Sequence, residues 1–210
     1  MPRSPFIIIA LIFLVGCVSQ AEIEESMSNI YNVPSSGTSQ FDESKYIRIS
    51  NMVCSNTVVF ELYQDTPKVK RGIVLLKAGS RSIDNIDNGK SLHIKTDNNK
   101  YSFASKDALT EHDKTHYGYG VTTYFSHKTY LVSESVIREI ASSNKFLVKM
   151  NLLNDTYIEG KCTPLSLQET QEQSVALNVE IKQEHVDTAS KFAAINGFRT
   201  FVRMMDSTAW

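Results

Sequence analysis

The chain has 210 residues, of which 41% are hydrophobic and 21% are charged, and its formal net charge is −1. This length is sufficient for one domain with a sizeable core. The nearly neutral charge argues against nucleic acid or an anionic membrane surface as a partner, because both attract clustered positive charge.

Residues 1–16 have the pattern of a secretory signal peptide. Arg3 supplies positive charge, residues 6–15 form an apolar run, and Gly16 is the small residue at its end. A membrane-spanning helix needs about 20 apolar residues, so this shorter run predicts a cleaved signal and not a permanent transmembrane helix.

The run Leu-Val-Gly-Cys that ends at Cys17 resembles the lipobox of bacterial lipoproteins. The resemblance implies that Cys17 carries lipid and becomes the first residue of the mature chain, so that acyl chains anchor the protein to a membrane. In that family an aspartate after the cysteine favours the inner membrane. Val18 stands there instead, which implies the outer membrane, facing the periplasm. The alternative is an ordinary signal peptide with an incidental cysteine.

The two other cysteines, Cys54 and Cys162, form an even pair once Cys17 is acylated. Cysteines in an oxidising compartment tend to form disulfides, so we expect a bond between these two. The alternative is that each is a separate buried thiol.

Residues 17–44 predict a flexible, acidic tether. Five acidic residues and no lysine or arginine occur in residues 18–44, among many serines, asparagines and glutamines. Such a segment has little apolar surface to bury, and its like charges extend it. The single folded domain is therefore expected to be residues 45–210.

Strand-forming residues, which are β-branched or aromatic, recur from Lys45 onward. Asp97, Asn98 and Asn99 predict a hairpin turn between two of these runs, because Asp and Asn tolerate left-handed backbone. The runs predict neighbouring strands of one antiparallel sheet. They are residues 46–49, 57–63, 72–77, 92–96, 100–103, 121–132, 146–152 and 156–162.

Two helices interrupt or follow these strands. A short helix is predicted after Ser133, with one apolar face, and a longer helix is predicted over residues 186–205. Residues 165–185 leave strand and irregular structure open. The fold class predicted is α+β, an antiparallel β-sheet with a short inserted helix and a C-terminal helix packed on it.

His112 and His116 are four residues apart, a spacing at which two imidazoles on a helix can share a metal ion. A helix is not credible here, because Gly118 and Gly120 follow at once. Zinc also needs a third protein ligand, which would have to come from His93 or His127 through folding. The competing interpretation is a polar, solvated loop.

Tyrosines crowd the same loop and the strand that follows it. Exposed aromatic side chains with a polar tip are common in binding surfaces, so Tyr117, Tyr119, Tyr124 and Tyr130 form a candidate binding surface. The alternative is ordinary packing against the sheet.

Two short motifs resemble catalytic or nucleotide-binding sequences but lack their context. Asn88 and Gly89 precede a lysine and a serine as in a phosphate loop, yet Asp84 stands where the first glycine belongs. Ser142 and Lys145 have the Ser-x-x-Lys spacing of penicillin-binding enzymes, but they close a predicted helix. The sequence therefore predicts no nucleotide, no catalytic residue of these classes and no cofactor.

These patterns favour a non-catalytic, lipid-anchored cell-envelope protein that binds or supports another envelope component. The partner is expected to be an envelope protein or the cell wall, and not nucleic acid. Enzymatic activity stays open at this stage. The alternative function is a metal-dependent hydrolase that acts on cell-wall or envelope material through His112 and His116.

Overall fold

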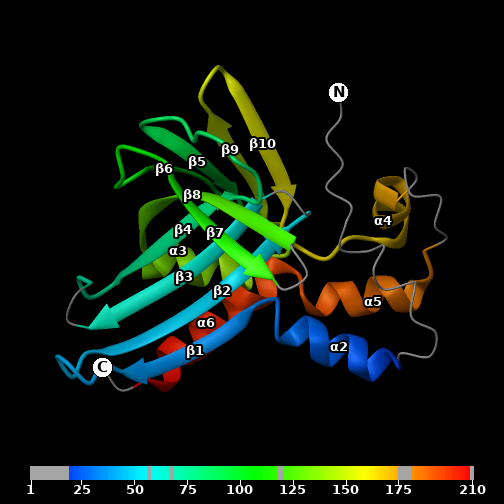
Figure 1. Cartoon of the computed structure of the whole chain (residues 1–210), viewed down its shortest axis with the longest axis horizontal. Coiled ribbons are helices and arrows are strands. Elements are labelled where there is room, and N and C mark those ends of the chain that lie inside the picture. The colour runs from blue at the N-terminus through cyan, green and yellow to red at the C-terminus, as the bar shows by residue number, and fades with distance from the viewer. Residues whose placement is uncertain (1–18, 56–57, 67–68, 118–120, 175–180, 209–210) are drawn as a thin grey trace.

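The computed structural model describes residues 19–55, 58–66, 69–117, 121–174 and 181–208 (Figure 1). In these ranges the protein has the predicted α+β architecture, with antiparallel strands, a short inserted helix and a C-terminal helix packed on a sheet. The strands form two sheets, and not the single sheet that the sequence predicts.

The larger sheet has six strands in the order β1-β2-β3-β4-β8-β7, and all neighbours are antiparallel. Hydrophobic residues alternate along the strands, so one face of this sheet is hydrophobic. That face packs against the helices and the smaller sheet. The bounds are β1 (Val33–Thr38), β2 (Lys45–Cys54), β3 (Val58–Thr66), β4 (Ile73–Ser80), β7 (Glu111–Tyr117) and β8 (Val121–Ser133).

The smaller sheet has four antiparallel strands in the order β10-β9-β5-β6. The turn predicted at Asp97 to Asn99 joins two of them, and it is closed by a hydrogen bond from the Thr96 amide to the Asn99 carbonyl at 2.9 Å. The bounds are β5 (Lys90–Lys95), β6 (Lys100–Ala104), β9 (Leu147–Leu152) and β10 (Thr156–Lys161).

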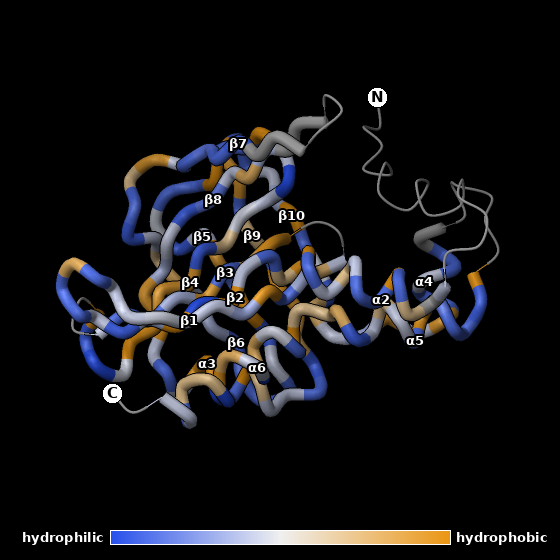
Figure 2. Tube along the Cα trace, turned by 60° about the horizontal axis from the view of Figure 1, so that its bottom comes forward, coloured by the Kyte–Doolittle hydropathy of each residue, from blue (hydrophilic) through white to orange (hydrophobic). Residues whose placement is uncertain are grey.

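Helices α3 (Glu134–Ser142) and α6 (Ala194–Ser207) pack against each other and cover one face of the larger sheet (Figures 1 and 2). Phe60, Phe146 and Phe198 meet in the core, with ring centroids 5.0 to 5.8 Å apart. Figure 2 shows hydrophobic segments in the middle of the molecule, whereas β7 is mostly hydrophilic. Buried aromatic area of this kind contributes strongly to stability.

The predicted C-terminal helix is broken into α5 (Gln183–Lys191) and α6. The break has a tertiary cause: Ala193 forms a β-bridge with Val53, and the Ile195 amide donates to the Cys162 carbonyl at 3.0 Å. Upstream, residues 165–185 include α4 (Leu167–Ser174), while residues 175–180 lie outside the described ranges.

The predicted tether is wrong for most of its length. Residues 17–18 lie outside the described ranges, but α2 (Gln20–Ser28) and β1 are both ordered. Two acidic residues that were expected to extend the segment by repulsion form stabilising contacts instead. Glu22 completes a capping box with Ser19, and Glu24 forms an ion pair with Lys191 at 2.7 Å. The folded part therefore begins well before Lys45.

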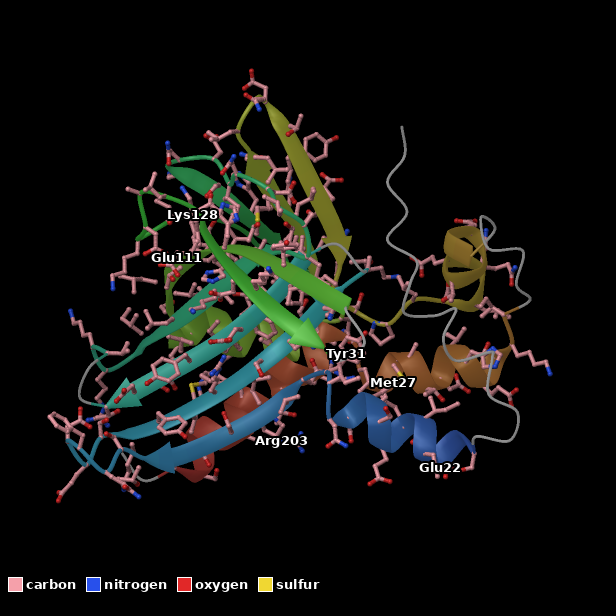
Figure 3. All side chains as sticks on the ribbon, in the orientation of Figure 1. Glu22, Met27, Tyr31, Glu111, Lys128 and Arg203 are labelled. Atoms are coloured by element: carbon pink, nitrogen blue, oxygen red, sulfur yellow. A yellow bond between two sulfur atoms is a disulfide. The ribbon has the colours of Figure 1, made fainter. Side chains whose placement is uncertain are left out.

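Tyr31 continues this attachment where α2 meets β1 (Figure 3). Its ring packs against Phe192 with centroids 6.4 Å apart, and the guanidinium of Arg81 lies 5.4 Å from the ring centroid. Asn32 donates to the Ala193 carbonyl at 3.2 Å. Contacts with distant residues, most of them more than 150 positions away in sequence, therefore hold the N-terminal segment, and its composition does not reveal them.

The predicted disulfide between Cys54 and Cys162 is confirmed. Cys54 is the last residue of β2, and Cys162 follows β10 directly, so the bond joins the two sheets. Both cysteines are buried. No described helix is long and apolar enough to cross a membrane.

Candidate functional site

A groove of about 650 Å³ lies on the outer face of the four-stranded sheet. Polar and charged side chains from all four strands line it, together with Ser55 from the end of β2. The lining residues are Ser55, His93, Ile94, Lys95, Lys100, Tyr101, Ser102, Leu147, Val148, Lys149, Glu159, Gly160 and Lys161.

The two-residue period of a strand places the charged groups on this face. Along β5, His93 and Lys95 alternate with the buried residues Leu92 and Ile94. Lys149 similarly stands between two buried residues of β9. The inward residues join the core, so the outward residues must form the groove.

The strand register brings two lysines into direct opposition at one end of the groove. Lys95 on β5 is paired with Lys100 on β6, and Lys145 lies close to Lys95. We call Lys95, Lys100 and Lys145 the lysine cluster. The positive charge of Lys145, and then that of Lys100, lowers the pKa of Lys95. No carboxylate of the described residues lies within 4.0 Å of these three amino groups.

Two further lysines of the groove have partners. Lys161 forms an ion pair with Glu169 of α4 at 2.7 Å, and the amino group of Lys149 lies 3.7 Å from the ring centroid of Tyr157. The hydrogen bonds from Lys161 and from the Ser166 amide lower the pKa of Glu169 to about 2. The charge at this end of the groove is therefore partly compensated.

His93 is held in a fixed orientation at the middle of the groove. The Asn151 amide group donates to Nε2 at 3.1 Å, which requires that nitrogen to be unprotonated. Nδ1 then donates to the Ser102 hydroxyl at 2.8 Å. These two contacts fix the orientation of the His93 ring.

Helix α3 and the residues that follow it hold the turn between Lys95 and Lys100. Glu139 accepts hydrogen bonds from Thr96, Asn99 and Tyr101, and these bonds, with that of Tyr101 the largest, lower the pKa of its carboxyl group. Asp97 accepts from the Asn144 amide at 2.6 Å. Glu139 therefore holds the turn from α3, and Asp97 holds it to the residues that follow α3. The hydrogen bond from Asn144 is the main cause of the lowered pKa of Asp97, and the charge of Lys145 contributes to it.

The candidate tyrosine surface is not formed as predicted. Tyr130 is fully buried, and its hydroxyl lies 2.9 Å from that of Ser91 in the core. Burial raises the pKa of Tyr130 to about 12. Tyr124 is half-buried, whereas Tyr119 and the side chain of Tyr117 lie outside the described part of the chain. Tyr130 therefore cannot belong to an exposed binding surface.

The region of the predicted metal site is an edge strand, β7, and not a loop. His112 Nδ1 lies 2.8 Å from the Ser126 hydroxyl, on one face of the sheet. His127 belongs to the opposite face, where its Nε2 lies 2.8 Å from Asp113. His93 is in the other sheet, so neither proposed third ligand reaches His112.

The side chain of His116 lies outside the described residues, and the metal site stays a prediction. Among the side chains that the structure describes, no three histidines, cysteines, aspartates or glutamates gather in a way that could hold a metal ion. The pairing of β7 with β8 explains why the segment is ordered despite its polar sequence, since charged residues are typical of edge strands.

The contact between His112 and Ser126 is structural. Ser126 is fully buried, and its hydroxyl donates to the Ser82 carbonyl at 2.5 Å and accepts from the Asp84 amide at 3.1 Å. A hydroxyl that holds a loop in this way is not presented to a substrate.

Lys128 is another buried polar group that has a structural role (Figure 3). Its amino group donates to the Asp87 and Ala108 carbonyls and to the Asn88 side chain, at 3.0 to 3.2 Å. Burial lowers the pKa of this amine. Gly89 follows with φ of 70°, so the stretch that resembles a phosphate loop is a turn, as the sequence predicts.

Comparison of the chain with known protein families, curated proteins and solved structures found no match. The site is therefore defined by its own geometry. The sequence analysis did not single out its lysines. The signal was present in the alternation of His93 and Lys95 before the turn and of Lys100 and Ser102 after it.

Proposed function

We propose that the protein is a non-catalytic, lipid-anchored cell-envelope protein that binds another envelope component through the groove on the four-stranded sheet. The observation that carries this proposal is the lysine cluster, since no carboxylate of the described residues lies within 4.0 Å of its three amino groups. A positive surface on a turn that is held in place is suited to recognition, because a complementary partner gains electrostatic attraction there.

The lipid anchor is proposed at Cys17, on the strength of the lipobox-like sequence. Gln20 is the first residue of α2, so only Val18 and Ser19 separate it from the lipidated cysteine. Three residue steps span at most about 10 Å. The proposed anchor therefore holds the domain close to the membrane, where a tethered binding site has a high effective concentration for partners of the same surface.

Site-specific photo-crosslinking in intact cells tests the binding proposal. A photoreactive residue at Ser102, in the groove, is expected to capture an envelope component. The same residue at Ser36, which is exposed on β1 of the other sheet, serves as the matched control. Equal capture from both positions, or none from Ser102, contradicts the assignment of the groove.

Fractionation of a Cys17→Ser variant tests the anchor separately. We expect uncleaved or mislocalised precursor, because the acylated residue is missing. Processing and membrane association like those of the parent protein would show that the cysteine is incidental.

A further inference from the structure

We infer that the groove binds an anionic polysaccharide, whose phosphate or carboxylate groups are held by the lysine cluster. This inference rests on the proposed function and names the chemistry of the partner. It starts from an energetic imbalance: like charges directly opposite each other destabilise a sheet, and Lys95 and Lys100 are such a pair. A bound anion would attract both amines and so offset the repulsion between them.

The distribution of charge indicates an extended ligand. The lysine cluster is at the β5–β6 end, whereas Lys149 and Lys161 are on β9 and β10. There Glu159, in register with Lys149, and Glu169, paired with Lys161, offset part of the positive charge. Four adjacent strands extend over roughly 14 Å, since neighbours lie about 4.8 Å apart. One free anion would occupy a single position, but a polymer with repeated charges reaches both ends of the groove. Ser102 places a hydroxyl group beside this path, whereas the Ser55 hydroxyl is held by the backbone of Lys161.

The shape and composition of the groove favour a polysaccharide over a membrane or a peptide. A hollow surface cannot follow a flat bilayer, and the large exposed hydrophobic side chains of the described residues lie outside the groove lining. An extended peptide is usually bound through backbone hydrogen bonds at a strand edge or through apolar pockets. A sheet face offers no unpaired backbone groups, so repeated charge is the feature that this surface can recognise.

Binding measurements on the mature chain with Cys17→Ser, residues 17–210, test the inference. The probes are polygalacturonate and phosphorylated dextran, with neutral dextran as the uncharged control. We expect binding of at least one charged polysaccharide and none of neutral dextran. The double variant Lys95→Gln, Lys100→Gln should bind at least tenfold more weakly. Lys77→Gln, on the outer face of the other sheet, is the matched control and should bind as the parent does.

Three further probes identify the ligand class: inorganic phosphate, polyglutamate and vesicles that contain phosphatidylglycerol. Tighter binding of either charged polysaccharide than of all three supports the inference. Equal or tighter binding of polyglutamate or of vesicles overturns it, as does an equal loss in the Lys77 variant or failure to bind either charged polysaccharide. If crosslinking from Ser102 still captures a protein in any of these cases, the proposed binding function stands and only the ligand class is wrong.

Discussion

The outer faces of the two sheets are both polar, antiparallel surfaces, but they treat charge differently. On the six-stranded sheet, Arg48 forms an ion pair with Glu61 at 2.6 Å, and Lys77 is paired in register with the same glutamate. Tyr63 donates to Asp65 at 2.6 Å. Opposite charges face each other across the strands, as sheet stability favours.

The four-stranded sheet has the reverse arrangement at one end. Lys95 is in register with Lys100, and Lys145 adds a third positive charge. Both sheets form, so compensated charge is not required for strand pairing in this protein. Because like charges directly opposite each other destabilise a sheet, the pairing of Lys95 with Lys100 is expected to lower the stability of the smaller sheet.

The largest expected effect concerns the disulfide that joins the two sheets. Replacing Cys54 and Cys162 together by alanine should lower the free energy of unfolding by about 3 to 5 kcal/mol, because the disulfide closes a loop with a sequence separation of 108. Chemical denaturation of the oxidised parent and of the variant measures the difference. Equal midpoints would show that the bond contributes nothing to the association of the sheets.

A second prediction concerns the edge of the six-stranded sheet. A shortened chain that begins at Lys45 lacks both α2 and β1, and β1 pairs with β2 over six residues. We expect it to lose about 2 kcal/mol of stability, because the hydrogen bonds of this mostly exposed edge strand are largely replaced by bonds to water when it is removed. A chain that begins at Ser19 keeps both elements and is the control. Equal stability of the two chains would restore the interpretation of this segment as a tether.

The third prediction compares the charges of the two faces directly. Lys100→Glu places an opposite charge beside Lys95 and should stabilise the protein by about 0.5 kcal/mol, whereas Lys77→Glu opposes Glu61 and should destabilise it by a similar amount. Denaturation at low salt measures both effects, which should shrink in 1 M salt. If both variants changed the free energy of unfolding in the same direction, the two faces would not differ in their charge pairing.

The smallest effect concerns Glu169, which compensates Lys161 at the edge of the groove. Its folded pKa of about 2 lies below the ordinary value of 4.5, so folding favours the ionised form. The resulting contribution to the free energy of unfolding is present above pH 4.5 and is lost as the pH falls from 4.5 through about 2. Because solvent screens this partly exposed ion pair, it contributes only about 0.3 kcal/mol to the free energy of unfolding. Glu169→Gln should flatten that part of the stability profile, and an unchanged profile would contradict it.

The sequence predicted the fold class well because local patterns carry that information. Eight predicted strand runs correspond to strands, and the helix after Ser133 is α3. The errors occur where tertiary contacts decide. The polar segments that became β1 and β7 are edge strands, whose sequences need not be hydrophobic, because only one side of each pairs with a neighbour.

The candidate site was harder to predict than the fold. The net charge of −1 concealed a local excess of lysine, because a sum over the chain contains no positions. The tyrosines were singled out by type, yet Tyr130 is buried, since its strand has one face in the core. Alternation along β5 and β9 indicates which side chains share a face, but it does not show which strands are neighbours.

The sequence by itself determined eight of the strands, the helix after Ser133, the turn at Asp97 to Asn99 and the even pair of cysteines, because these depend on residue type and short spacing. Only the tertiary structure decided that β5 lies between β6 and β9, that Cys54 meets Cys162, and that Lys95 opposes Lys100. These features depend on strand order and register, which follow from how all the hydrophobic faces share one core and not from any local pattern.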